Sequence, residues 1–361
     1  MVIDESKPHS GLRDLAQVRG PHIAMTLAKI ALLVVLMTGC SALAPGADVT
    51  FRARGPLATR PQHPMLLTML GPRPRSVRTQ PEGSTGFAAD LSWSSIFEQA
   101  GGPPPLGVFR MDGEFGRASV RARHGLGPDT DIEIEIAALY ASSGFLDQFV
   151  NDFHELFGFP DSGRSLAPVD DFRMSFTSGG GQRYRFAEDT LGFGDLPVFL
   201  THRVRREDED GPGVAVRVGV EFPTGDEADG FSNGGIDFGA GVLIERARGP
   251  WVFTGSFDVI LPASPDGLKT VGIEYGEQYR LQVGCERNWT DRLSLLANLH
   301  LRSPITDDFA FEEIDREILD LGLGFAWDVS DDAILQASFH EDLVSATGAD
   351  FGVFVGLLVG F

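Results

Sequence analysis

From residue 87 to the C-terminus, short segments of alternating apolar and polar residues are separated by turn residues. In the segment 214–222, for example, every second residue is Val or Phe, and the residues between them are Ala, Arg, Gly and Glu. A period of two places successive side chains on opposite faces of a β-strand. The pattern therefore predicts a series of strands, each with one apolar and one polar face.

About twelve strands are predicted in this region, at approximately 88–98, 108–124, 130–141, 194–206, 213–222, 235–246, 251–261, 278–288, 292–302, 318–328, 333–342 and 350–361. Alternation alone would also suit a β-sandwich with one wet face. However, short turns and long polar loops follow one another in strict order, and aromatic residues gather near the strand ends, as in outer-membrane barrels. We therefore predict an all-β fold, a transmembrane antiparallel β-barrel of about 12 strands over residues 87–361, with one amphipathic helix in a loop.

The composition limits the partners of this barrel. The chain has 361 residues, with 30 Lys and Arg against 51 Asp and Glu, a net charge of −21. Nucleic acid is excluded as a partner because phosphate binding requires clustered basic side chains. No apolar run approaches the roughly 20 residues of a membrane-spanning helix. The excess of acid predicts a preference for cations over anions if the barrel interior conducts.

The N-terminal region predicts export. Residues 25–37 combine a charged start with a short apolar run, as in a secretory signal peptide, and residues 1–24 look like an over-extended start. The sequence Met37-Thr-Gly-Cys40 resembles the lipobox of bacterial lipoproteins, in which the cysteine becomes the lipid anchor. Cleavage after residues 42–44, with Cys40 discarded, is the alternative. We interpret 1–40 as a signal peptide with lipobox.

Residues 41–86 differ from both neighbours, because they are rich in Pro and Arg and have no sustained periodicity. The stretch contains six arginines between residues 52 and 78 but only two acids, Asp48 and Glu82. We interpret the segment as a basic linker or a plug of the barrel.

Charged residues on the polar faces of the strands form the main candidate site. With the turn placed at 126–130, Arg123 should face Asp131 and Arg121 should face Glu133. The predicted lumen-lining charges are Arg121, Arg123, Asp131, Glu133, Arg217, Glu221, Asp258, Arg280, Glu286, His300 and Arg302. They could pair with one another as structural elements, or they could form a charged wall that orients a solute. The two interpretations are compatible.

The segment 144–158 has apolar residues at helical spacing, so it predicts an amphipathic helix. Its polar side carries Asp147, Asn151 and His154, which we predict to cap the lumen. A lid that moves over a substrate is the functional alternative. One histidine with a carboxylate and an amide is a weak ligand set, and the acidic loop 226–229 lacks the spacing of an EF-hand. We therefore predict no metal and no cofactor.

Several motifs together resemble a known family. They are the helix 144–158, Asp112-Gly-Glu114, the run 121–126, Gly163-Arg164, Gly192-Phe-Gly-Asp195, Glu221-Phe-Pro-Thr-Gly225 and Phe339-His-Glu-Asp342. They resemble the bacterial family catalogued as domain of unknown function 3187, over roughly residues 55–361. The resemblance implies an outer-membrane barrel and assigns no activity.

We predict a protein of the outer membrane of a Gram-negative bacterium, most simply a narrow pore or binding protein for small solutes. Outer-membrane lipid and an unidentified small solute are the expected partners, together with the assembly machinery, whose recognition signal the strand ending at Phe361 resembles. An outer-membrane enzyme acting on lipid is one alternative, although His202, His300 and His340 lie in no recognisable serine motif. A soluble periplasmic β-rich lipoprotein is the other.

Overall fold

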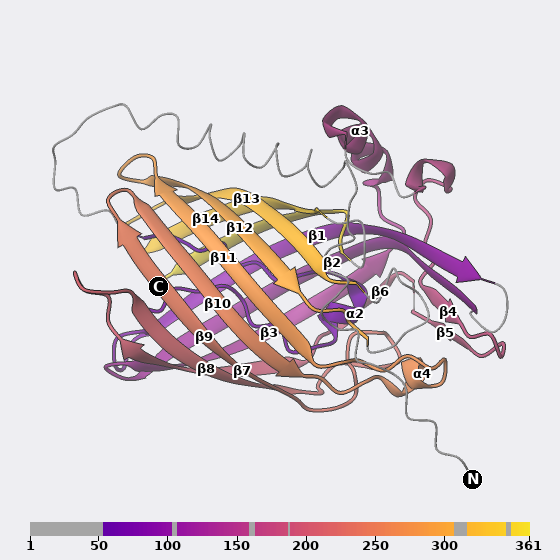
Figure 1. Ribbon diagram of the computed structural model, residues 1–361, viewed down its shortest axis with the longest axis horizontal. Helices are drawn as coiled ribbons and strands as arrows, with labels where there is room; N and C mark the ends of the chain where they lie inside the picture. The colour runs from indigo at the N-terminus through magenta and orange to yellow at the C-terminus, as the bar shows by residue number, and fades with distance from the viewer. Residues whose placement is uncertain (1–52, 103–106, 159–162, 187, 307–315, 344–347) are drawn as a thin grey trace, which may run out of the picture. The chain divides into compact units, whose positions relative to one another are not determined.

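The computed structural model describes residues 53–102, 107–158, 163–186, 188–306, 316–343 and 348–361. Within these ranges twelve antiparallel strands close into a barrel (Figure 1), which confirms the predicted fold class. The barrel strands are β1 Thr85–Gly102, β2 Gly107–Gly127, β3 Thr130–Ser142, β7 Leu196–Arg205, β8 Gly213–Phe222, β9 Asp237–Arg248, β10 Trp251–Leu261, β11 Gln278–Asn288, β12 Leu293–Arg302, β13 Ile318–Asp328, β14 Ala333–Asp342 and β15 Phe351–Val359. The signal peptide and Cys40 lie outside the described residues.

Each strand pairs with its neighbour in the chain, and β15 pairs with β1 to close the barrel, with Phe87 opposite Val359. Tight connections follow β2, β7, β9, β11 and β13, and they gather at one end of the barrel, which we call the short-turn end. The C-terminus lies at this end in Figure 1. The opposite end, the long-loop end, carries the long connections.

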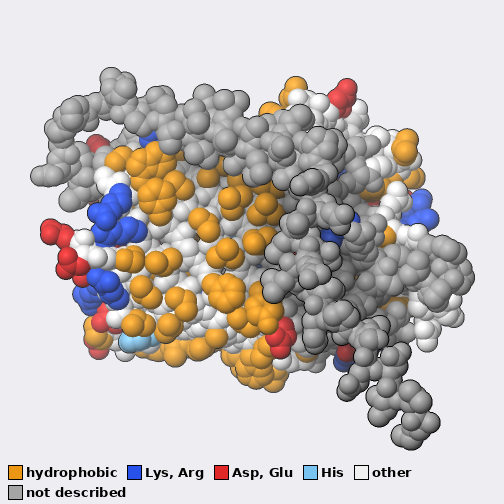
Figure 2. All heavy atoms as spheres, viewed as in Figure 1, with side chains coloured by type: hydrophobic (Ala, Val, Ile, Leu, Met, Phe, Trp, Pro, Cys, Tyr) orange, Lys and Arg blue, Asp and Glu red, His pale blue; other side chains and the backbone are white. Residues whose placement is uncertain are grey.

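The outer wall is apolar. On β8 the polar side chains of the alternating pattern point inward and the valines outward. Outward apolar residues halfway along other strands are also exposed, among them Leu91 with 64% and Ile136 with 59% of the residue surface accessible. Figure 2 shows one face of the barrel wall as a broad hydrophobic surface, with Lys, Arg, Asp and Glu at its edges. A surface of this extent needs apolar surroundings. Among the described residues no helix is long and apolar enough to cross a membrane.

Smaller elements decorate the long-loop end. The hairpin of β4 Ser175–Thr177 and β5 Arg183–Arg185 extends the sheet, because β4 pairs with the first residues of β2. Strand β6 Thr190–Phe193 pairs with residues 138–141 near the end of β3. Helix α3 covers Asp147–Phe157, and two short turns of helix, η2 Arg164–Leu166 and α4 Asp266–Lys269, lie in other loops. Helix α3 ends at Gly158, whose φ of 69° is the left-handed conformation that terminates many helices. The predicted amphipathic helix is thus confirmed.

The lumen, which is the space inside the barrel, holds residues 53–81, which we call the plug. One leg rises from the short-turn end to the long-loop end, where helix α2 Pro64–Leu67 forms the apex. A second leg descends to the short-turn end, where β1 begins. Most plug side chains are buried, including Leu57, Met65 and Leu70. Part of the predicted linker or plug therefore fills the interior of the barrel.

Candidate functional site: the lumen and its plug

The rising leg of the plug is held by polar side chains of β11–β14. The Arg54 side chain donates to Asp328 at 2.8 Å and to Asn288 at 2.7 Å, and its backbone N–H donates to Glu286 at 2.9 Å. Higher up, the Gln336 amide donates to the carbonyls of residues 54 and 56 and accepts from the N–H of Ala58. These side chains satisfy plug backbone groups that water would otherwise bind.

The descending leg carries the ion pairs. Arg73 donates to Glu135 at 2.8 Å and to Asp90 at 3.2 Å, on β3 and β1. Arg75 binds Asp131 through both terminal nitrogens, at 3.0 and 2.8 Å. All five side chains are buried. A planar guanidinium matches a carboxylate in two parallel hydrogen bonds, so the second pair fixes orientation as well as distance.

The register between β2 and β3 corrects the predicted pairs. Arg123 lies opposite Glu133, to which it donates at 2.6 Å, and Arg121 lies opposite Glu135. The predicted register, with Arg123 opposite Asp131 and Arg121 opposite Glu133, is therefore wrong by two residues, although an Arg121 terminal nitrogen still lies 4.0 Å from a Glu133 carboxylate oxygen. A turn centred on residue 128 places residues at equal distance from 128 opposite each other, so Arg123 meets Glu133 and Arg121 meets Glu135; the predicted partners lay two residues too close to the turn.

The other predicted lumen charges are buried, but they are not equally paired. Arg217 donates to Asp258 at 2.7 and 2.6 Å, and Glu221 lies 3.6 Å from Arg60 of the plug. Arg302 pairs with Asp320. Glu286 accepts from Arg54, as described above. By contrast, the Arg280 Nε and Nη2 atoms and the His300 Nε2 atom have no hydrogen-bond partner among the described residues.

An apolar cluster closes the long-loop end around α2. Met65, Leu66 and Leu67 pack with inward side chains of the strand ends and with side chains of the loops, including Phe176 of β4 and Tyr275. Met65 is fully buried and Leu66 and Leu67 nearly so. Each such side chain contributes roughly 1.5–3 kcal/mol when it is removed from water. The apex is therefore a hydrophobic seal, whereas the legs below it are held by polar contacts.

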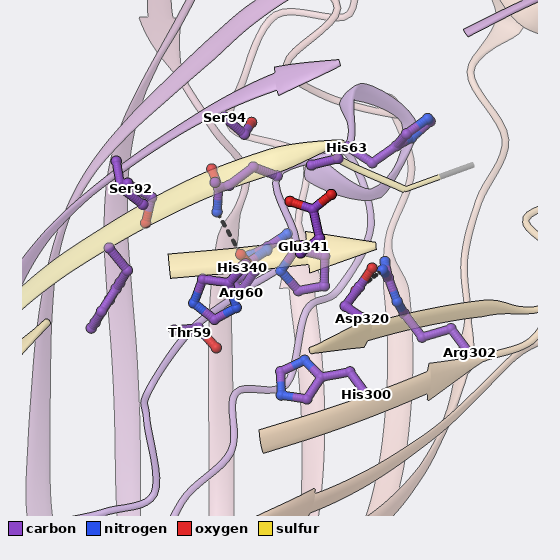
Figure 3. A pocket seen from close by; sticks show the side chains of 16 residues that line it. Thr59, Arg60, His63, Ser92, Ser94, His300, Arg302, Asp320, His340 and Glu341 are labelled. Carbon is purple, nitrogen blue, oxygen red and sulfur yellow. Dashed lines mark hydrogen bonds and ion pairs between the residues drawn. The ribbon is translucent and has the colours of Figure 1, made fainter. Parts of the chain in front are cut away.

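Among the described residues, two cavities beside the plug are lined by predicted lumen charges. The larger, of about 220 Å³, lies at the short-turn end between the two legs and the wall, and Arg121, Arg123 and Phe361 line it. The smaller, of about 40 Å³, lies deeper and is lined by residues of the rising leg and of β1 and β12–β15 (Figure 3). His63, His300 and His340 all contribute to this smaller cavity. Among the described residues no cluster of His, Cys, Asp and Glu is arranged to hold a metal ion.

Helix α3 lies against the outer face of the wall, so its predicted role as a cap of the lumen is wrong. Phe149 packs on Phe351 of β15 with ring centres 5.2 Å apart, and Phe153 packs on both Phe351 and Phe339. Residues 351 and 339 occupy outward positions of their strands. Apolar side chains on both the helix and the outer wall explain this placement. The lumen at this end is closed by α2 instead.

The polar side of α3 is turned toward buried partners. Asp147 accepts from Arg164 at 2.5 Å, and His154 lies 3.0 Å from Glu341, whereas Asn151 is half-buried. Burial disfavours a charged His154, but the hydrogen bond and the charge of Glu341 outweigh burial and raise the pKa of His154 above its ordinary value of 6.5. Asp147 and His154 therefore anchor the helix, and among the described residues the three side chains bind no common partner.

Two histidines of the barrel strands contact hydroxyl groups, as the base of a serine–histidine site does. His340 contacts Ser338 at 2.8 Å inside the lumen, and His202 contacts Thr130 at 2.9 Å near the short-turn end. Among the described residues no carboxylate hydrogen-bonds to either ring, although a third group normally orients the base in a serine–histidine site.

Comparison with known proteins identifies the family of this chain. The model described as protein of unknown function (DUF3187) matches residues 30–361. The chain belongs to this family. Among solved structures, the COG4313 outer membrane channel from Pseudomonas putida F1 is 16% identical with a TM-score of 0.53, and the match covers 79% of this chain and 98% of that one. Because the identity is only 16%, this likeness supports the fold of the DUF3187 chain and carries no statement about its role.

Two further solved structures match with lower scores. The KdgM porin is 6% identical with a TM-score of 0.40, and the match covers 76% of this chain and 99% of that one. The Pseudomonas putida toluene transporter TodX is 9% identical with a TM-score of 0.35, covering 78% and 90%. No curated protein matches the DUF3187 chain.

Sequence reasoning missed the plug residues that matter most in the lumen of this DUF3187 protein. Arg73 and Arg75 belong to the stretch interpreted as a basic linker or plug. Asp131, the acceptor of Arg75, is a predicted lumen charge, whereas Asp90 and Glu135, the acceptors of Arg73, are not. The alternation of arginine and proline over residues 73–75, beside strands with inward acids, was the available signal. It identifies charges that can meet but not the strand that each one reaches.

Proposed function

We propose that this protein is an outer-membrane pore for small solutes that is closed by its own N-terminal segment. The observation that carries the proposal is the plug, which fills the lumen with a buried chain held by polar contacts. A permanently solid barrel interior could be built from the inward side chains of the wall alone, as in small barrels. Here the wall encloses a separate segment, whose release would leave a channel lined by charged side chains.

The distribution of contacts supports release from the short-turn end. Both legs reach that end, and a cavity of about 220 Å³ already separates them there from the wall. Hydrogen bonds and ion pairs, unlike covalent links, can be exchanged for water as the plug moves. The acids of the lumen are largely matched by arginines, so plug release would also expose carboxylates such as Asp131 and Glu135.

Planar-bilayer conductance of the full chain tests this function. We expect the wild-type protein to be mostly closed, and the double variant Arg73→Met with Arg75→Met to open far more often, because two arginines that tie the plug to the wall are lost. Arg205→Met is the matched control, since Arg205 pairs with Asp208 at the exposed short-turn end. Heat-modifiable gel migration would show that each variant is a folded barrel.

One result would refute the proposed pore. If the double variant shows no conductance although protease digestion shows that its plug is accessible, the lumen does not conduct, and a binding role is the better explanation. The outer-membrane location and the anchor at Cys40 are further parts of the proposal. Labelling with radioactive palmitate that is lost in Cys40→Ala supports the anchor, and unchanged labelling or none contradicts it.

A further inference from the structure

One row of residues across the inner wall contains more arginine than it can pair. The strand register places Arg217 of β8, Gly241 of β9, Asp258 of β10, Arg280 of β11 and Arg302 of β12 side by side at one level. Three arginines thus share the row with one carboxylate. Like charges directly opposite one another on neighbouring strands are destabilising, as Arg280 and Arg302 are here.

The carboxylate next to Arg280 is already occupied. Asp258 lies directly opposite Arg280, yet it accepts both of its short hydrogen bonds from Arg217, which reaches it across β9. Gly241 makes this reach possible, because a Cβ at that position would overlap the Asp258 carboxylate. On the other side, Asp320 is taken by Arg302.

Arg280 therefore remains unpaired in the interior. Its side chain is only 2% exposed, and among the described residues it makes no hydrogen bond or ion pair, with Nε and Nη2 both buried. An isolated buried charge costs several kcal/mol unless a counter-charge accompanies it. The surrounding carboxylates do not supply one, because Glu221 lies against Arg60 and Glu341 lies against His154.

Further donors without acceptors converge on the same region. The small cavity of Figure 3 is lined by Arg60, His300 and Arg302, and also by two carboxylates, Asp320, which is held by Arg302, and Glu341, which is held by His154. Buried nitrogens of all three, Nε of Arg60, Nε2 of His300 and Nε and Nη1 of Arg302, have no partner among the described residues. Arg302 is the cross-strand neighbour of Arg280, and His300 lies one inward position further along β12.

We infer that the small cavity binds a small inorganic anion, of the size and charge of a halide, against Arg60, His300 and Arg302, with Arg280 on the neighbouring strand as the charge that it balances. A cavity of about 40 Å³ has room for a group of that size, since a single water needs only about 10–15 Å³ on the same measure. The anion supplies the acceptor and the negative charge that the row lacks. The site requires no conduction through the lumen, so it does not depend on the proposed pore.

Thermal unfolding of the full chain in detergent tests the site, with sodium chloride or bromide compared against sodium gluconate at equal ionic strength. Gluconate is too large for the cavity. We expect the wild type to unfold several degrees higher in either halide. Arg280→Met should lose this halide shift and should be more stable than the wild type in gluconate, because the uncompensated charge is gone. Arg280→Lys should keep part of the shift.

Arg54→Met is the matched control, since it removes another buried arginine whose partner Asp328 lies at the short-turn end. It should be less stable in both salts and keep the halide shift. The inference is overturned if the wild type unfolds at the same temperature in halide and gluconate, which would mean that water alone fills the cavity. It is also overturned if Arg280→Met retains the full shift, which would make the halide effect a general one.

Discussion

Replacing Arg75 by methionine should detach the descending leg of the plug while leaving the barrel closed. The guanidinium binds both oxygens of Asp131, at 3.0 and 2.8 Å, and also donates to Thr201 at 3.1 Å. Asp131 is fully buried, and after the substitution its remaining donor would be the Gln80 N–H at 3.0 Å. Removing one partner of a buried ion pair typically costs about 3–5 kcal/mol.

That cost sets the size of the expected effect. Each 1.4 kcal/mol is a factor of ten, so local opening of the leg should increase by roughly two to three and a half orders of magnitude. Hydrogen exchange measured by mass spectrometry on residues 75–84 reports this opening directly. Protection in the central barrel strands should stay unchanged, because their backbone hydrogen bonds do not involve the plug.

A double variant separates the loss of the pair from the burial of a lone charge. Arg75→Met combined with Asp131→Leu removes both charges, and replacing a buried pair by apolar groups is often close to neutral. We therefore expect protection to recover substantially in the double variant. Unchanged protection in Arg75→Met would refute the assignment of this pair as a lock of the plug, as would equal loss of protection in the single and double variants.

Three other perturbations test separate parts of the structure. Leu57→Ala should lower the free energy of unfolding by about 2–5 kcal/mol, because Leu57 is fully buried against the wall, and denaturant unfolding measures the change. Gly241→Ala should lower the unfolding temperature, because the new Cβ displaces the Asp258 carboxylate; an unchanged temperature would contradict the register. Protonated His154 stabilises the docked α3 fully below pH 6.5, and this contribution is lost as pH rises through the raised pKa of His154. Hydrogen exchange of residues 147–157 should therefore accelerate with pH by more than the intrinsic exchange rate does. His154→Gln should abolish this additional acceleration.

The barrel strands were predictable because alternation is a local property. A wall with lipid-like surroundings on one side and a polar interior on the other forces a period of two along every strand, and residues 214–222 show it without interruption. The ends of strands were less predictable. For example, β1 continues to Gly102, beyond the predicted end at 98, because it pairs with β2 along its whole length above the barrel rim.

The chemistry inside the lumen was less accessible to sequence reasoning. Alternation identifies which face Arg217 occupies, but its partner Asp258 lies two strands away, beyond Gly241, and only the register shows that they meet. The same holds for the β2–β3 pairs, where a shift of two residues in register changes every partner. Helix α3 has a correctly predicted apolar stripe, yet a stripe does not tell which side of a barrel wall it covers.

The way the plug is tied to the wall also orders the folding of the protein. Arg54 and Ala58 bind Asp328 and Gln336, residues 274 and 278 positions later in the chain. Contacts of such sequence separation form slowly, because the chain must lose loop-closure entropy before they contribute. Although the plug is among the first parts to be synthesised, it gains its anchors on β13 and β14 only when the last strands are in place. Locking of the interior is therefore coupled in time to closure of the β1–β15 seam.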